Sequence, residues 1–319
     1  MARGALTLAF CGMVSAGAVI PAFAQETDRA SLSGEIVSDG SSTVGPITQA
    51  VAEEFAGEAP DVRTSVDISG TGGGFERFCN GETDLQNASR PIDEDEVALC
   101  EENGVEYHEL EVAFDGITVV ANPENDFLEC LNVDALRQMW QAEEPATTWA
   151  DLNPEFPDET FALYGPGTDS GTFDYFVETI LEDGEIRQDF TPSEDDNVLV
   201  EGVAGDPNAL GYFGFAYYEN NQDTLKAIAI DGGDGCVLPS RETIEDGSYA
   251  PLSRPLYVYL NEASLERPEV QEFMRFYVEE AANLVGDVGY VALPEERYAE
   301  DAEALEAAIN GDGAATPEA

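Results

Sequence analysis

Three short segments rich in Gly, Ser and Thr interrupt the chain, each between a strand-like run and a helix-like run. They are residues 39–44 (DGSSTV), 69–74 (SGTGGG) and 167–172 (GTDSGT). A strand that turns through glycine into a helix leaves several backbone N–H groups without intrahelical partners. The hydroxyl groups add donors, and the helix dipole adds a partial positive charge at the helix start. Three such turns in one chain predict a pocket that holds an oxyanion without using lysine.

Acidic residues outnumber basic ones along the whole chain. It carries 66 Asp and Glu against 13 Lys and Arg, a formal net charge of −53, and Lys226 is its single lysine. A field of this sign repels nucleic acid and anionic membranes, so neither is expected as a partner. A bound anion must therefore be held by local dipoles. We interpret the spread of acids as a solvated surface of the halophilic type; an acidic partner-binding surface and a calcium store are the alternatives.

The N-terminal residues predict export. Arg3 precedes an apolar stretch at 5–20, and the A-x-A pattern at 22–24 is typical of a signal-peptide cleavage site before Gln25. No later apolar run approaches the length that spans a bilayer. The sequence therefore predicts a signal peptide over 1–24 and a periplasmic protein, expected to be a monomer, that does not insert into the membrane.

Four cysteines follow the predicted signal peptide: Cys79, Cys100, Cys130 and Cys236. An even number in an exported protein favours two disulfides, although four cysteines allow three connectivities. We expect Cys79 to pair with Cys100, which lies in the same segment, and Cys130 to pair with Cys236. A zinc site is the alternative, but the chain has no C-x-x-C spacing and a single histidine, His108. Neither a metal nor a cofactor is therefore expected.

Strand-like and helix-like runs alternate along the chain, which predicts an α/β fold with parallel strands. The part after the signal peptide is larger than one comfortable core, so we expect two lobes. Predicted strands lie at 35–38, 63–68, 114–121, 161–164, 211–216, 225–230 and 255–260. Predicted helices lie at 43–55, 75–79, 134–140, 173–181 and 268–285. If the middle of the chain forms its own lobe, the pocket lies between the lobes, where strand ends and helix starts converge.

The three turns, together with 87–92 (NASRPI), match a known family in the same order along the chain. With 165–173 (GPGTDSGTF), 114–120 (FDGITVV) and 252–256 (LSRPL), they resemble the periplasmic phosphate-binding proteins of phosphate ABC importers. The resemblance covers nearly all of the chain after the signal peptide. It implies an α/β fold of the type II periplasmic-binding class, a two-lobed clamshell with a central mixed sheet in each lobe. Lobe 1 would take 25–115, lobe 2 would take 116–254, and 255–319 would return to lobe 1 and add C-terminal helices and an acidic tail.

The same resemblance implies a ligand and a set of donors. Inorganic phosphate would bind in the interlobe cleft and be delivered to the membrane permease subunits of an ABC importer. Each implied position carries a hydroxyl, a free helix-start N–H, or a glycine where the backbone must approach closely. The implied donors are Ser42, Thr43, Thr71, Gly72, Ser170, Gly171 and Thr172. We add Ser41 as a candidate, with the alternative that it only shapes its turn.

The third turn departs from the pattern of the best-known members. Those proteins carry an arginine four residues before the serine of the third turn, and an aspartate in the segment that matches 87–92; these two positions hold Pro166 and Arg90 here. We expect Arg90 to supply the cationic contact, since a guanidinium suits a bidentate oxyanion. We expect Asp169 to accept the proton that phosphate, unlike sulfate, still carries. The alternatives are that Asp169 caps its helix and that Arg90 pairs with a nearby acid.

Two other classes of function compete with a phosphate receptor. Residues 167–171 superficially resemble the surroundings of a protease nucleophile, but a serine hydrolase needs a base within hydrogen-bond reach of Ser170. His108 lies in a strand-like stretch instead, and a phosphatase would need metal ligands. We therefore do not expect an enzyme. The other class is a binder of sulfate, molybdate or tungstate on the same fold, against which a carboxylate in the pocket would favour phosphate.

Overall fold

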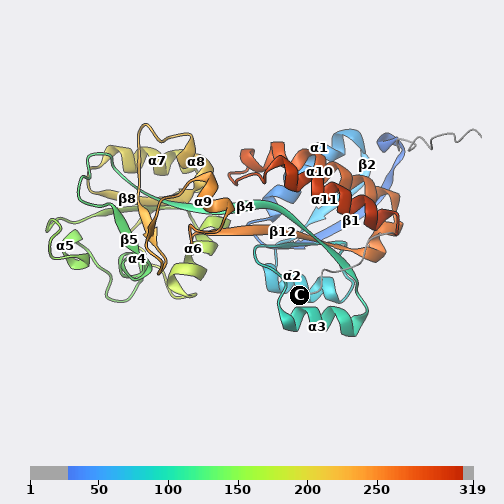
Figure 1. Cartoon of the computed structure of the whole chain (residues 1–319), viewed down its shortest axis with the longest axis horizontal. Helices are drawn as coiled ribbons and strands as arrows, with labels where there is room; N and C mark the ends of the chain where they lie inside the picture. The colour runs from blue at the N-terminus through green and yellow to red at the C-terminus, as the bar shows by residue number, and fades with distance from the viewer. Residues whose placement is uncertain (1–27, 312–319) are drawn as a thin grey trace, which may run out of the picture.

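Strand β4 (Tyr107–Ala121) runs through both of the lobes into which the chain folds in the computed structural model. The structure describes residues 28–311, so the predicted signal peptide and the last residues of the acidic tail lie outside it. Strand β4 carries the chain from lobe 1 into lobe 2, and β12 (Ser253–Asn261) brings it back (Figure 1). The expected lobe limits at 115/116 and 254/255 fall within these two strands, beside the cross-strand pairs Asp115–Arg254 and Gly116–Ser253.

Lobe 1 contains a mixed sheet with the strand order β2-β1-β3-β12-β4. Strands β2 and β3 pair parallel to β1, whereas β12 runs antiparallel to both β3 and β4. The three parallel strands are β1 (Ser33–Gly40), β2 (Asp61–Val66) and β3 (Leu85–Ala88). Their carboxyl ends meet at one edge, where the first two Gly/Ser/Thr turns begin.

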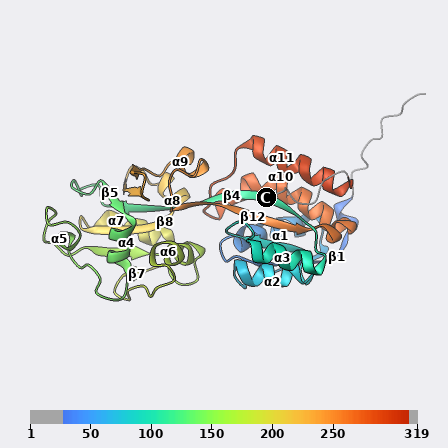
Figure 2. The same cartoon turned by 60° about the horizontal axis from the view of Figure 1, so that its bottom comes forward.

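Helices cover both faces of this sheet (Figures 1 and 2). One face carries α1 (Gly45–Glu58), α10 (Pro268–Asp287) and α11 (Glu295–Ile309); the other carries α2 (Thr71–Cys79) and α3 (Glu94–Asn103). The short 3₁₀ helices of this lobe are η1 (Arg29–Ser31) and η2 (Glu262–Glu266). The helix α1 buries Ile47, Val51 and Phe55 against the sheet, as their four-residue spacing predicts.

Lobe 2 continues the sheet through the second part of β4. There β4 pairs antiparallel with β8, which is followed by β6 and β7, while β9 also pairs with β4. These strands are β6 (Ala162–Gly165), β7 (Thr191–Pro192), β8 (Ala209–Gly214) and β9 (Lys226–Ala227). A separate three-stranded sheet contains β5 (Cys130–Asn132), β10 (Ala229–Asp231) and β11 (Cys236–Val237).

The helices of lobe 2 surround these sheets. They are α4 (Val133–Trp140), α5 (Trp149–Leu152), α6 (Gly171–Leu181), α7 (Asp196–Gly205), α8 (Phe215–Glu219) and α9 (Arg241–Glu245). The aromatic rings of Trp140, Phe176 and Tyr212 form a contact cluster that joins α4, α6 and β8. Between residues 28 and 311, no helix is long and apolar enough to cross a membrane.

The α/β fold with two lobes and a mixed sheet in each is confirmed, and the two sheets share β4. Several boundaries differ from the predicted ones, and two of these differences have clear reasons. Helix α1 begins at Gly45 rather than Thr43, since Pro46 lacks an N–H and belongs in a first helical turn. The strand predicted at 225–230 is two strands, because the chain passes from the large sheet to the small one at Ile228, whose N–H donates to the carbonyl of Val119.

Both expected disulfides are present. Cys79 pairs with Cys100 between α2 and α3, where both side chains are buried, and Cys130 pairs with Cys236 between β5 and β11. The second bond joins residues 106 positions apart, so it closes a much longer loop than the first, whose separation is 21. In the chain-entropy model, the longer loop gives the larger restriction of the unfolded chain.

Candidate functional site

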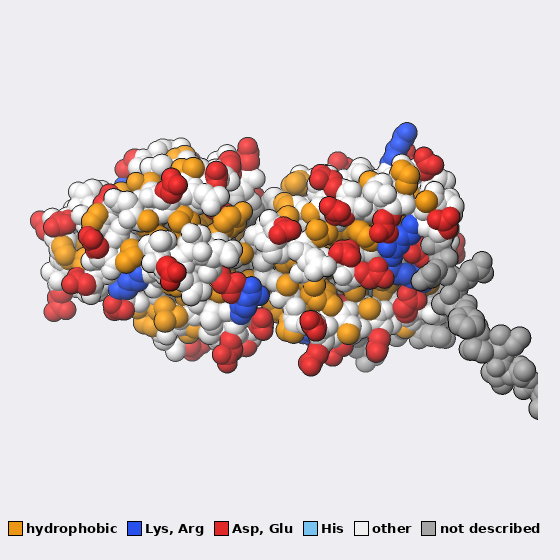
Figure 3. Space-filling view, turned by 90° about the horizontal axis from the view of Figure 1, so that it is seen from above, with side chains coloured by type: hydrophobic (Ala, Val, Ile, Leu, Met, Phe, Trp, Pro, Cys, Tyr) orange, Lys and Arg blue, Asp and Glu red, His pale blue; other side chains and the backbone are white. Residues whose placement is uncertain are grey.

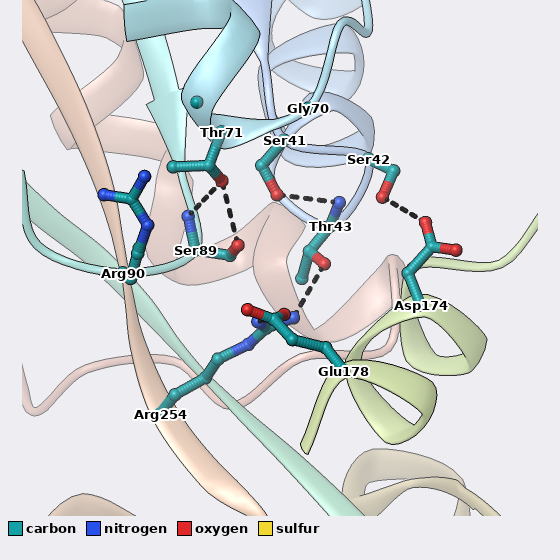
Figure 4. Close-up of a pocket in the computed structure, with 11 residues that line it drawn as sticks. Ser41, Ser42, Thr43, Gly70, Thr71, Ser89, Arg90, Asp174, Glu178 and Arg254 are labelled. Carbon is teal, nitrogen blue, oxygen red and sulfur yellow. Dashed lines mark hydrogen bonds and ion pairs between the residues drawn. The ribbon is translucent and has the colours of Figure 1, made fainter. Parts of the chain in front are cut away.

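A cavity of about 330 Å³ lies between the lobes, at the starts of α1 and α2 (Figure 4). Lobe 1 lines one side of it with the first two turns and the segment after β3, and α6 of lobe 2 lines the other. The lining is polar or charged apart from glycine. It consists of Ser41, Ser42, Thr43, Gly70, Thr71, Gly72, Ser89, Arg90, Asp174, Glu178 and Arg254.

The first turn presents hydroxyl groups because α1 begins only at Gly45. The Oγ of Ser41 accepts a hydrogen bond from the N–H of Thr43 at 3.1 Å. The Oγ of Ser42 donates to Oδ2 of Asp174, across the cleft, at 2.8 Å. The Oγ1 of Thr43 accepts from Nη2 of Arg254 at 3.1 Å. All three predicted residues of this turn therefore line the cavity, and two of them contact groups that sequence reasoning did not assign to it.

The second turn forms the first residues of α2, since the helix begins at Thr71 and not at Phe75 as expected. Gly70 precedes it with φ of 80°, a conformation that favours glycine. Gly74 lies so close to β1 that a Cβ would stand 2.6 Å from the Cα of Gly40. The first N–H groups of α2 have no intrahelical acceptors and lie beside the cavity. The Thr71 hydroxyl lies 3.0 Å from that of Ser89.

The side chain of Asp39, at the end of β1, holds the first two turns together. Its buried Oδ1 accepts hydrogen bonds from the N–H of Gly40 at 2.7 Å and of Ser69 at 3.0 Å, and its Oδ2 pairs with Arg77 on α2. Burial alone would raise the pKa of Asp39, but Arg77 and the two N–H donors outweigh it and hold that pKa below its usual value. One carboxylate thus fixes the second turn relative to the end of β1.

Arg254 enters the site from β12, where it stands opposite Asp115 on β4. Its Nε lies 3.4 Å from Oδ2 of Asp115, and its guanidinium carbon lies 3.5 Å from the ring centroid of Tyr175. The Asp115 side chain is almost fully buried, and burial raises its pKa although Arg254 opposes the shift. Arg254 is therefore held at the crossing of the two strands and projects toward Thr43.

Arg90 also lines the cavity, but its guanidinium is engaged elsewhere. Its two terminal nitrogens donate to the two carboxylate oxygens of Glu96, each at 2.8 Å. Asp93 lies 3.7 Å from the same group. This arrangement is the ion pairing that the sequence left open as an alternative for Arg90. The hydrogen bond to Glu96 raises the pKa of Arg90 further, so its charge is fixed.

The third turn lies beside this cavity rather than in its lining. Ser170 is the residue that caps α6, because its Oγ accepts from the N–H of Thr172 at 3.2 Å. Gly171 abuts the first turn, where a Cβ would stand 2.8 Å from the Cα of Thr43. Asp169 is exposed, and its N–H points to Glu194 at 3.4 Å. The helix cap that the sequence left open as an alternative for Asp169 therefore falls one residue later. Asp169, expected to accept the proton of phosphate, does not line the cavity.

Sequence reasoning missed the roles of Ser89, Asp174, Glu178 and Arg254. Ser89 and Arg254 lie within the segments NASRPI and LSRPL, which were matched as motifs without assigning these side chains. Asp174 and Glu178 are four residues apart, a spacing that places both on one face of the helix that follows the third turn. In the part of the chain that the structure describes, no group of three or more His, Cys, Asp or Glu side chains could hold a metal ion.

Comparison with known proteins gives one consistent result. A model described as a PBP superfamily domain matches residues 25–281. Protein SphX of Synechocystis sp. is 52% identical over 270 residues, covering 83% of this chain and 80% of its own length. The phosphate-binding protein PstS of Staphylococcus saprophyticus is 41% identical, covering 88% of this chain and 86% of its own length. The crystal structure of a possible phosphate binding protein from Planctomyces limnophilus has a TM-score of 0.83 at 46% identity, covering 88% of this chain and 99% of its own length.

The contacts of Asp39 predict a pH-dependent loss of stability in Asp39→Asn. We expect a loss of about 1–3 kcal/mol near pH 7. The amide keeps one oxygen for the two N–H groups, but it replaces the charged Oδ2 that pairs with Arg77 by an NH2 donor. A lowered pKa contributes stability above the unfolded value of about 3.9, and this contribution disappears as the pH falls through the folded value. Urea unfolding of both proteins between pH 7 and pH 3 should therefore show a difference that shrinks below pH ~4.

The control is Asp67→Asn, whose side chain is 59% exposed beside the same arginine. It should change stability by less than about 0.5 kcal/mol. Equal stability of wild type and Asp39→Asn at pH 7, or a difference that grows toward low pH, would contradict the role assigned to Asp39.

Proposed function

This chain belongs to the phosphate-binding proteins of the PBP superfamily, and from that membership we propose that it captures inorganic phosphate between its lobes and delivers it to the permease subunits of an ABC importer. The observation that carries the proposal is the cavity itself. Hydroxyl groups from two turns, helix-start N–H groups of α2 and the guanidinium of Arg254 converge on it without a lysine. These are the donors that a tetrahedral oxyanion requires.

Each part of the phosphate has a proposed partner. The hydroxyl groups of Thr43 and Thr71 and the N–H groups at the start of α2 bind oxygens from the lobe 1 side, together with Ser41 and Ser42. Arg254 supplies the cation, since its planar fork suits two oxygens of one anion. The third turn, at Ser170, Gly171 and Thr172, closes on the ligand from lobe 2 because it already touches the first turn at Thr43. Arg90, whose charge is neutralised by Glu96, contributes less to phosphate binding than Arg254 does.

Selectivity for phosphate requires an acceptor for its proton. We assign this role to Asp174, which lines the cavity and already accepts a hydrogen bond from a hydroxyl group, that of Ser42. Sulfate carries no proton near neutral pH, so it would place an unprotonated oxygen against this carboxylate. The lost charge-assisted hydrogen bond and the added repulsion disfavour sulfate, and the same argument applies to molybdate and tungstate.

We further propose that the protein acts in the periplasm, after removal of residues 1–24, as a receptor without catalytic activity of its own. The related phosphate-binding protein PstS supports this assignment. The alternative of a serine hydrolase gains no support from the surroundings of Ser170, whose hydroxyl caps α6. His108 lies on β4 in lobe 1 with Glu262 4.0 Å away, and it does not line the cavity.

Isothermal titration of the phosphate-stripped protein tests the proposed ligand and its selectivity together. Wild type should bind one phosphate per chain and show no heat with sulfate. Asp174→Asn should lose about tenfold or more in phosphate affinity, the loss of one hydrogen bond to a charged group, and should gain measurable sulfate binding. Asp183→Asn, which changes an exposed carboxylate of the same lobe outside the cavity, is the control. Binding of sulfate in preference to phosphate by wild type would leave the fold assignment intact but would show that phosphate is not the ligand.

The two arginines of the cavity should differ in their effect on phosphate affinity. Arg254→Lys keeps the charge beside Asp115 but loses the fork, and we expect phosphate to bind about tenfold or more weakly. Arg90→Gln should weaken binding by no more than about threefold, because Glu96 already neutralises Arg90. Titration of both variants, with melting curves to show that each is folded, measures the difference. A larger loss in Arg90→Gln than in Arg254→Lys would restore Arg90 as the main cationic ligand.

A further inference from the structure

Helix α6 places two carboxylates in the lining of an anion site, where their negative charges repel the ligand. Asp174 and Glu178 lie one turn apart and both line the cavity. Each contacts a donor of the site: Asp174 accepts from the Ser42 hydroxyl at 2.8 Å, and Oε2 of Glu178 lies 3.3 Å from Nη1 of Arg254 (Figure 4). An oxyanion entering the cavity therefore meets donors that carboxylates already hold.

The three polar partners of Arg254 are not equally replaceable. Asp115 is 1% exposed and lies opposite Arg254 in the strand ladder, so it cannot leave without disturbing the crossing of β4 and β12. Thr43 belongs to the first turn and is buried as well. The side chain of Glu178, in contrast, is 58% exposed. A half-exposed carboxylate gains little from an ion pair and can turn out into solvent.

The guanidinium of Arg254 stays in place when the carboxylate of Glu178 turns away. The guanidinium stacks on Tyr175, whose hydroxyl donates to the carbonyl of Pro251 at 2.8 Å. Tyr175 is 4% exposed, and Arg254 itself is 13% exposed. The nitrogen that faces Glu178 is therefore held in position for another acceptor.

We propose that Glu178 is a built-in competitor of the ligand, and that phosphate binds by exchanging with its carboxylate on Arg254. This inference rests on the proposed function, because it concerns how that same site is regulated. The pair Glu178–Arg254 joins α6 of lobe 2 to the returning strand, and Arg254 also contacts Thr43 of lobe 1. Because phosphate must displace the carboxylate of Glu178, the exchange lowers phosphate affinity. Binding of the anion also breaks the contact between α6 of lobe 2 and Arg254. A receptor regulated in this way releases its ligand more readily than the donor set alone would allow.

Removal of this carboxylate should strengthen binding, which is the opposite of what loss of a ligand contact does. We expect Glu178→Gln to bind phosphate about three- to tenfold more tightly than wild type at low salt. The gain should shrink toward 1 M NaCl, where the Debye length is about 3 Å. Glu178→Ala should change affinity in the same direction. Isothermal titration with inorganic phosphate at both salt concentrations measures these values, with melting curves as the check of folding.

The matched control is Glu201→Gln, an exposed glutamate on α7 of the same lobe that does not line the cavity. It carries the same change of charge and should leave phosphate affinity within about twofold of wild type. Weaker or unchanged binding by Glu178→Gln, with wild type binding phosphate, would overturn this inference alone. An equal gain of phosphate affinity in Glu201→Gln would also overturn it, since the effect would then come from the reduced net negative charge of the protein. No phosphate binding by wild type would overturn the proposed function and this inference with it.

Discussion

The antiparallel pairing of β4 with β12 joins the two lobes and places a charged pair, Asp115 and Arg254, opposite each other at the crossing. Asp115 is buried among the strands, where a carboxylate without a cation would be costly. Arg254 meets that requirement with Nε and keeps Nη1 and Nη2 directed toward the cavity. Arg254 thus both neutralises the buried carboxylate at the crossing and supplies the cation of the anion site.

A chain with a formal net charge of −53 can hold an anion because the relevant field is local. Acidic side chains are scattered over both lobes, and basic ones are few (Figure 3). Against this background the cavity brings together hydroxyl groups, the N-terminal ends of α1 and α2 and the guanidinium of Arg254. At short range, screening by solvent and salt is weak. The halophilic type of surface that the sequence predicts stays a prediction.

Local patterns predicted most of the fold and the lobe 1 part of the site. The spacing of Ile47, Val51 and Phe55 identified α1. The resemblance of the first two turns to phosphate-binding proteins implied Ser42, Thr43, Thr71 and Gly72, which line the cavity together with the added candidate Ser41. The split at Ile228 was not predictable, because it depends on which sheet each half pairs with. Arg254 was missed for a similar reason: it is far from the turns in sequence, and only the pairing of β12 with β4 brings it beneath them.

A crystal structure of the phosphate complex tests the central claim, that one cavity made by the first two turns and Arg254 holds the ligand. We predict a single phosphate within hydrogen-bond distance of Thr43, Thr71 and the Arg254 guanidinium, with Asp174 facing one of its oxygens. The carboxylate of Glu178 should have left Arg254. Phosphate bound away from Arg254, or outside the cavity between the lobes, would show that this cavity is not the binding site.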